Sequence, residues 1–124
     1  MKKCLVLNDN NASRERTYTY LSAYDFDIDL MSDGEEALSL CEQKMPDVII
    51  VNSRMSKMDG LQFLERLSIL RRARYCHSPV ILFCLDSTDI EAMGKAVWNG
   101  ATECLMKPFD ADILDFKLHQ SGAI

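Results

Sequence analysis

Short apolar runs recur at regular intervals along the chain and are separated by longer segments of mixed polarity. Five of these runs have the length of a β-strand, and they cover residues 3–7, 26–30, 48–51, 80–83 and 103–106. Runs such as 48–51 are apolar throughout, which is typical of a strand in a parallel sheet that is covered on both faces. The pattern therefore predicts an α/β fold built on five parallel strands.

Signals for helices lie between the strand-like runs. Ile90, Met93 and Val97 repeat at helical spacing after the fourth run, and similar stripes follow other runs. Starts that fit the capping box or a close variant are Ser32 with Glu35, Asp59 with Gln62, and Thr88 with Glu91. We expect one helix after each strand, and hence a doubly wound five-stranded parallel sheet with five helices.

In such a sheet, functional side chains gather at the carboxyl ends of the strands. The residues that follow the predicted strands are Asn8 and Asp9 after the first, Asn52 after the third, Cys84 after the fourth and Lys107 after the fifth. These five residues are therefore the candidates for a functional site.

Size and charge limit the possible functions. A chain of 124 residues with 48% apolar residues suffices for one compact domain, which we assign to residues 1–124 without an output domain. Neither end carries an apolar run long enough to span a bilayer, so we expect a cytoplasmic protein with no membrane partner. The net charge of −5 argues against nucleic-acid binding. Residues 71–74 alone are locally basic, and we expect them to form a solvated helix end.

The cysteines do not predict a redox or metal site. There are five of them, an odd number, and they include no C-x-x-C pair. They are Cys4, Cys41, Cys76, Cys84 and Cys104. Because most lie inside apolar segments, we expect reduced core residues.

Several short motifs, taken in order, resemble the receiver domain of two-component response regulators. They cover almost the whole chain, and they are Leu5-Val-Leu-Asn-Asp9, Ser32-Asp-Gly-Glu-Glu-Ala-Leu38, Met55-Ser-Lys-Met-Asp-Gly60, Asn99-Gly-Ala101 and Met106-Lys-Pro-Phe109. The resemblance implies a flavodoxin-like receiver fold with strand order 2-1-3-4-5. A small flavin carrier would share this architecture, but it should show a phosphate loop rich in glycine and hydroxyl residues after the first strand. The segment 8–12 is not such a loop.

The resemblance also assigns roles to the residues at the strand ends. In receivers, two adjacent acids and a phosphoaccepting aspartate hold Mg²⁺, and a lysine contacts the phosphoryl group. Asp9 falls on the second acid and Lys107 on the lysine, so these two are kept. Asn8 falls on the first acid and Asn52 on the phosphoacceptor, so both of these acids are replaced by amides.

Two further receiver positions differ in their chemistry. Cys84 falls on the hydroxyl residue that contacts the phosphoryl group, and Cys104 falls on the aromatic switch residue. A thiol is a weak hydrogen-bond donor, and Cys104 lacks the aromatic volume used for switching. The resemblance thus points to a degenerate phosphorylation site, a pseudo-receiver, with no enzymatic activity.

The two kept residues and Asn52 each allow two interpretations. Asp9 and Lys107 either form an ion pair or retain a weak metal or anion site. Asn52 either is structural, bonded to Lys107 or to the loop backbone, or replaces the aspartate of an ordinary phosphoaccepting receiver. We expect no cofactor under the first interpretation of Asn52, and Mg²⁺ only under the second.

Without phosphorylation, signalling has to act through a surface. In the family this surface is the face formed by the fourth helix, the fifth strand and the fifth helix, and the expected partners are a histidine kinase, another response regulator, a docked target protein or a second copy. Trp98, at the end of the predicted fourth helix, is the candidate anchor if it is exposed. The alternative is that Trp98 folds back against the sheet edge.

Overall fold

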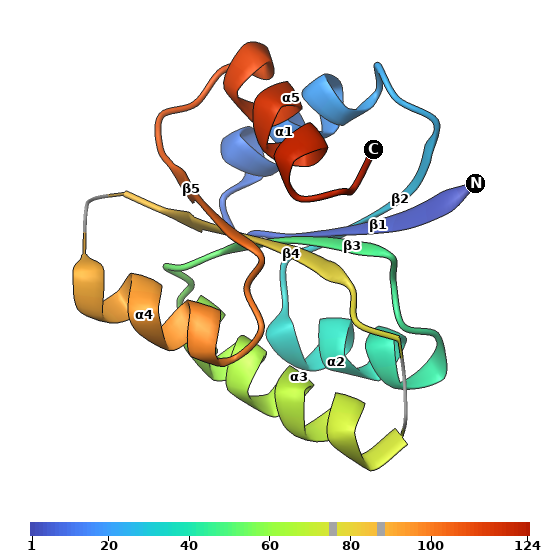
Figure 1. Ribbon diagram of the computed structural model, residues 1–124, viewed down its shortest axis with the longest axis vertical. Helices are drawn as coiled ribbons and strands as arrows, with labels where there is room; N and C mark the ends of the chain where they lie inside the picture. Colours follow the sequence, from blue (N-terminus) through green and yellow to red (C-terminus); the bar gives the residue numbers. More distant parts are fainter. Residues whose placement is uncertain (75–76, 87–88) are drawn as a thin grey trace.

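The computed structural model describes residues 1–74, 77–86 and 89–124. Within these residues, five parallel strands form a sheet in the order β2-β1-β3-β4-β5 (Figure 1). The strands are β1 (Lys2–Leu7), β2 (Phe26–Met31), β3 (Val48–Asn52), β4 (Val80–Leu85) and β5 (Glu103–Met106). The helices are α1 (Asn11–Leu21), α2 (Gly34–Gln43), α3 (Gly60–Arg74), α4 (Ile90–Trp98) and α5 (Ala111–Gln120). The predicted α/β fold and its strand order are confirmed.

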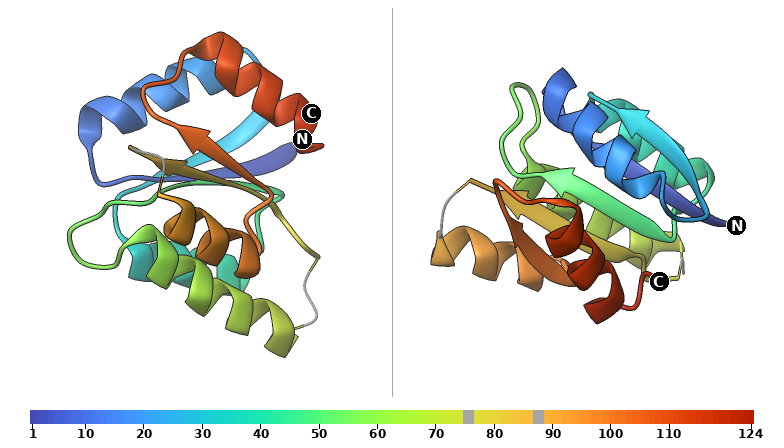
Figure 2. Two further views of the ribbon diagram at one scale, coloured as in Figure 1. Left: turned by 60° about the vertical axis from the view of Figure 1, so that its left-hand side comes forward. Right: turned by 90° about the horizontal axis from the view of Figure 1, so that it is seen from above.

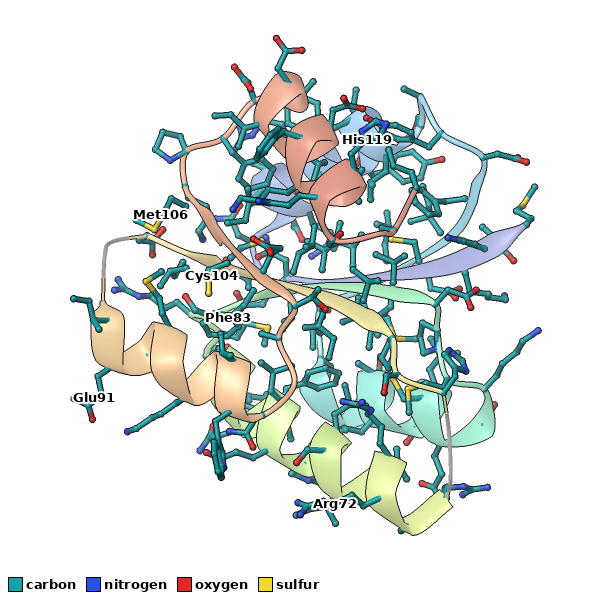
Figure 3. The ribbon with its side chains drawn as sticks, in the orientation of Figure 1. Arg72, Phe83, Glu91, Cys104, Met106 and His119 are labelled. Carbon is teal, nitrogen blue, oxygen red and sulfur yellow. The ribbon has the colours of Figure 1, made fainter. Side chains whose placement is uncertain are left out.

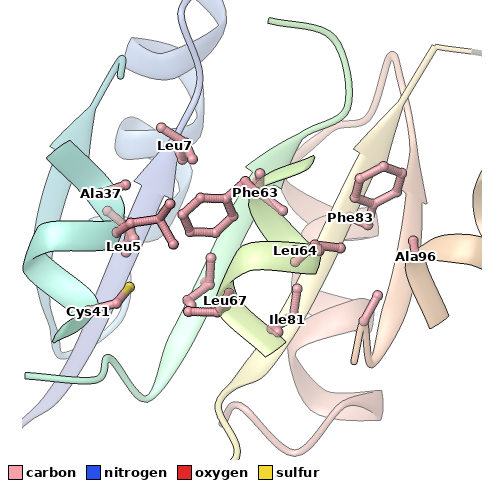
Figure 4. Packing of buried hydrophobic residues seen from close by; sticks show 14 of the residues in the cluster. Leu5, Leu7, Ala37, Cys41, Phe63, Leu64, Leu67, Ile81, Phe83 and Ala96 are labelled. Atoms are coloured by element: carbon pink, nitrogen blue, oxygen red, sulfur yellow. The ribbon is translucent and has the colours of Figure 1, made fainter. Parts of the chain in front are cut away.

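Helices cover both faces of the sheet. α1 and α5 lie against one face, and α2, α3 and α4 lie against the other (Figure 1, Figure 2). Successive residues of β1 point to opposite faces, so Leu5 and Leu7 pack in the cluster beneath α2, α3 and α4, as Figure 4 shows, whereas Cys4 and Val6 pack beneath α1 and α5. The central strand β3 is buried at every position. Both faces of the central strands are thus occupied by core packing, which leaves their carboxyl ends for polar groups.

Four predicted strands are longer than the sequence indicated, and the extensions of β3 and β4 change the assignment of the site residues. β3 continues through Asn52, and β4 continues through Leu85. Cys84 therefore lies inside β4, where it pairs with Asn52 of β3, and not after the strand as predicted. The polar residue that directly follows β4 is Asp86.

The helix starts were predicted with mixed success. The backbone N–H of Asp59 donates to Gln62 Oε1 (2.9 Å), and the N–H of Gln62 donates to Asp59 Oδ1 (2.8 Å), so this reciprocal cap is confirmed. The prediction for α2 was one residue early, because Asp33 and not Ser32 accepts the first backbone N–H groups. Thr88 lies outside the described residues, and Asp89 caps α4.

α4 buries a different stripe from the one predicted. Ile90 is 80% exposed and Val97 is also exposed, whereas Ala96 is fully buried and Met93 is half-buried. Ala96 belongs to the core cluster beneath α2, α3 and α4, and Met93 packs against this cluster.

Of the four cysteines that the structure describes, Cys4, Cys84 and Cys104 are free. Cys4, Cys41 and Cys84 are buried, and Cys104 is half-buried. Cys76 lies outside the described residues. The described helices include none that combines the length and the apolar character needed to cross a bilayer.

Candidate functional site

The carboxyl ends of the central strands open into a cleft of about 1040 Å³. Side chains that line it include Asp9, which follows β1, Asn52 at the end of β3, Asp86 after β4 and Lys107 after β5. Parallel strands place these residues together because their carboxyl ends share one edge of the sheet. The structure thus gathers three of the five predicted strand-end residues, Asp9, Asn52 and Lys107, and adds Asp86 to them, whereas Asn8 and Cys84 do not line this cleft.

Asn52 is 6% exposed, and both ends of its side-chain amide have partners. The carbonyl oxygen Oδ1 accepts a hydrogen bond from Lys107 Nζ. The amide nitrogen Nδ2 donates to the backbone carbonyl of Arg54 at 2.7 Å. These contacts confirm the prediction that Asn52 bonds to Lys107 or to the loop backbone, since it does both.

Lys107 pairs with a carboxylate that the sequence analysis did not select. Its Nζ lies 3.2 Å from Asp86 Oδ1, and the predicted ion pair with Asp9 is wrong. Asp86 also lies 3.7 Å from Nε of Arg54, which is largely exposed. Asp86 was missed because the predicted fourth strand stopped at residue 83. The apolar run continues to Leu85, and the same strand-end rule applied there would have selected Asp86.

Asn8 and Asp9, the two residues after β1, form hydrogen bonds with different parts of the chain. Asp9 Oδ2 accepts a hydrogen bond from the backbone N–H of Ser56 (2.8 Å), so this carboxylate is tied to the loop after β3. Asn8 is buried; its Nδ2 donates to Ser13 Oγ (2.9 Å), and its Oδ1 accepts from the backbone N–H of Asn10 (3.0 Å). Asn8 therefore organises the start of α1, and Asp9 is the one carboxylate of this pair.

Cys84 and Cys104 lie on opposite faces of the sheet. Cys84 packs with the cluster beneath α1 and α5, and burial raises the pKa of its thiol to about 12. Cys104 is on the edge strand opposite Phe83, toward α4 (Figure 3), and burial is also the main cause of its raised pKa. Both thiols are therefore protonated at neutral pH, and neither supplies a reactive thiolate.

Trp98 is 89% exposed, which decides between the two arrangements that the sequence left open. Its surroundings differ from the prediction, because it lines a groove with the last turns of α3 rather than with α5. The elements α4, β5 and α5 carry other exposed apolar residues, which are Ile90, Val97, Met106, Ile113 and Phe116.

Residues 4–119 match the model of the response regulator receiver domain. The chain belongs to this family. Receiver domains are generally non-enzymatic signalling domains of two-component systems, and they interact with histidine kinases or other response regulators.

Individual relatives of this receiver agree with the family match. The regulatory protein AtoC of Escherichia coli is 29% identical over 115 residues, which cover 93% of this chain and 24% of AtoC. The DNA-binding transcriptional regulator NtrC of Salmonella typhimurium is 32% identical over 107 residues, which cover 86% of this chain and 22% of NtrC. The receiver thus spans about a quarter of the length of these curated relatives. The chemotaxis protein CheY4 of Vibrio cholerae has a similar structure, with a TM-score of 0.85, 27% identity and 98% coverage of both chains.

Proposed function

We propose that this receiver signals without aspartyl phosphorylation and acts through protein contacts within a two-component or phosphorelay system. The observation that carries the proposal is the state of Asn52 at the end of β3. Its amide bonds to Lys107 on one side and to the Arg54 carbonyl on the other. The side chain at the phosphoacceptor position thus links β3 to β5 and to the following loop.

An amide at this position cannot accept a phosphoryl group in the usual way. Transfer needs an anionic oxygen nucleophile placed in line with the leaving group, and neutral Asn52 offers none. The ammonium group of Lys107 also has partners already, because it donates a hydrogen bond to Asn52 and forms an ion pair with Asp86. Both residues therefore support a static hydrogen-bonded cluster.

The donor set also fits Mg²⁺ poorly. Mg²⁺ in proteins is usually held by one or two carboxylates together with phosphate oxygens. Here Asn8 is neutral, Asp9 is bonded to the loop backbone, and the charge of Asp86 is offset by Lys107. Among the described residues, no group of three or more His, Cys, Asp and Glu side chains is placed to hold a metal. We therefore expect Mg²⁺ binding to be weak or absent.

The exposed apolar side chains of α4, β5 and α5 support a role in protein contacts. Met106 lies on the edge strand near α4 (Figure 3), and Phe116 is exposed on α5. Such side chains lose water contact when a partner covers them. The partners that fit this proposal are a histidine kinase, another response regulator, a target protein or a second copy of the chain.

Intact-mass measurement after incubation with Mg²⁺ and a small phosphodonor tests the proposal. We expect no added phosphate on the wild-type chain, and a base-labile phosphate adduct on it would overturn the proposal. The matched control is the double variant Asn8→Asp/Asn52→Asp, which restores both acids and should become phosphorylated.

The alternative function is an ordinary Mg²⁺-dependent phosphoacceptor whose aspartate has been replaced by Asn52. The kept residues Asp9 and Lys107 favour it. The single variant Asn52→Asp separates the two functions. If it is phosphorylated as readily as the double variant, one substitution explains the loss. If only the double variant reacts, the loss also involves Asn8.

A further inference from the structure

An open groove of about 450 Å³ lies between the carboxyl-terminal ends of α3 and α4, away from the strand-end cleft. Its lining consists of Ser68, Arg71, Arg72, Trp98, Asn99 and Gly100. The groove thus combines an aromatic side chain from one helix with two guanidinium groups from another.

Arg71 is held in place at the junction of the two helices. Its Nη2 donates to Ser78 Oγ at 2.6 Å. Gly100, with φ of +104°, makes room for it, because a Cβ there would lie 2.7 Å from Arg71 Nη1. Arg71 therefore presents a positioned positive charge beside the end of α4.

Arg72 is exposed and points away from α3 (Figure 3). The hydrogen bond that its Nε donates to the Ser68 carbonyl is long, at 3.3 Å. Within the described residues, neither Arg71 nor Arg72 forms an ion pair with a carboxylate, whereas Arg66 on the same helix pairs with Glu35. The two groove arginines thus keep their charges available for an external anion.

Trp98 supplies the apolar part of the groove. It is 89% exposed and is the single tryptophan of the chain. Tryptophan and arginine are, with tyrosine, the residue types enriched among residues that dominate binding energy at interfaces. A carboxylate can bind a guanidinium through two parallel hydrogen bonds, while an apolar side chain covers the indole ring.

We propose that this groove binds an acidic segment of a partner protein, with its carboxylates on Arg71 and Arg72 and an apolar side chain against Trp98. Charge complementarity favours this occupant, because Arg71 and Arg72 place two positive charges at the groove in a chain whose net charge is −5. The inference rests on the proposed role in protein contacts and specifies the chemistry of one partner.

Selection of short random peptides displayed on phage, with the wild-type chain as bait, tests the groove. We expect the enriched peptides to contain Asp or Glu together with an apolar residue. For a synthetic copy of an enriched peptide, titration calorimetry should show about 2–5-fold weaker binding to Arg72→Gln, as for the loss of one exposed ion pair. Trp98→Ala should weaken binding at least about tenfold.

Arg66→Gln is the matched control, because it removes the same charge from the same helix outside the groove, and it should bind like the wild type. Enriched peptides without acidic residues, or equal binding to wild type, Arg72→Gln and Trp98→Ala, would overturn the proposal. Trp98 fluorescence that changes with protein concentration alone, together with dimers in sedimentation, would instead identify a second copy as the occupant and would also overturn it.

This test is separate from that of the proposed function. Peptides that bind but are insensitive to Arg72 and Trp98 refute the groove and leave a role in protein contacts in place. A phosphate adduct on the wild-type chain refutes phosphorylation-independent signalling, whatever the groove binds.

Discussion

Replacing Gly60 with alanine is expected to lower the free energy of unfolding by about 1–3 kcal/mol, the usual cost of overpacking. Gly60 is the first residue of α3 and lies against the end of β3. A Cβ there would lie 2.5 Å from the backbone oxygen of Asn52 and 2.9 Å from both the Ser53 Cα and the ring of Phe83. Two of these three neighbours are backbone atoms, so they cannot move aside without shifting the strand end.

Gly94→Ala is the matched control for this substitution. Gly94 lies within α4, and a Cβ there would meet no heavy atom within 4 Å apart from its chain neighbours and the nearby backbone of its own helix. Helix propensity then dominates, and alanine should raise the free energy of unfolding by about 0.5–1 kcal/mol. Propensity alone would favour alanine at both positions, so opposite signs can come only from the packing around Gly60.

Urea unfolding followed by circular dichroism measures both variants. The midpoint should fall for Gly60→Ala and rise for Gly94→Ala, and in a thermal scan each kcal/mol should shift the midpoint by roughly 4 °C. A Gly60→Ala variant as stable as the wild type would refute the close approach of α3 to β3, and with it the placement of the loop that holds Asn52.

Two further predictions concern individual side chains. Lys107→Met should lower the free energy of unfolding by about 1–3 kcal/mol in urea, because the buried Asn52 oxygen loses its donor and the Asp86 pair is broken; an unchanged midpoint would contradict this. Tyr24 should ionise well above the usual tyrosine pKa of about 10, because burial and then its hydrogen bond to Asp115 raise its pKa to about 12. Its contribution to stability is complete below the unfolded pKa of about 10 and is lost as the pH rises toward 12. The tyrosinate absorbance that develops near pH 12 should be missing in Tyr24→Phe, and an unchanged rise in absorbance near pH 12 in this variant would refute the assignment.

Local patterns were sufficient for much of the fold. Apolar runs and helix caps depend on neighbours in the chain, so the five strands, the reciprocal cap of Asp59 with Gln62 and the parallel sheet could be predicted. Errors arose where a tertiary contact decides between similar local choices. Asp33 replaced Ser32 as the cap of α2, and α4 packed through Ala96 rather than Ile90 and Val97.

The sequence by itself determined which chemistry the strand ends carry, because a residue type does not depend on the fold. Asn52 can supply no carboxylate in any structure, and Lys107 brings an amine in every arrangement. Only the tertiary structure decided which groups these residues meet. Lys107 pairs with Asp86 and not with Asp9, and Trp98 lies beside the arginines of α3. Such contacts form between segments that are far apart in the sequence but only a few ångströms apart in space. They depend on the length of each strand and on how the helices pack against the sheet.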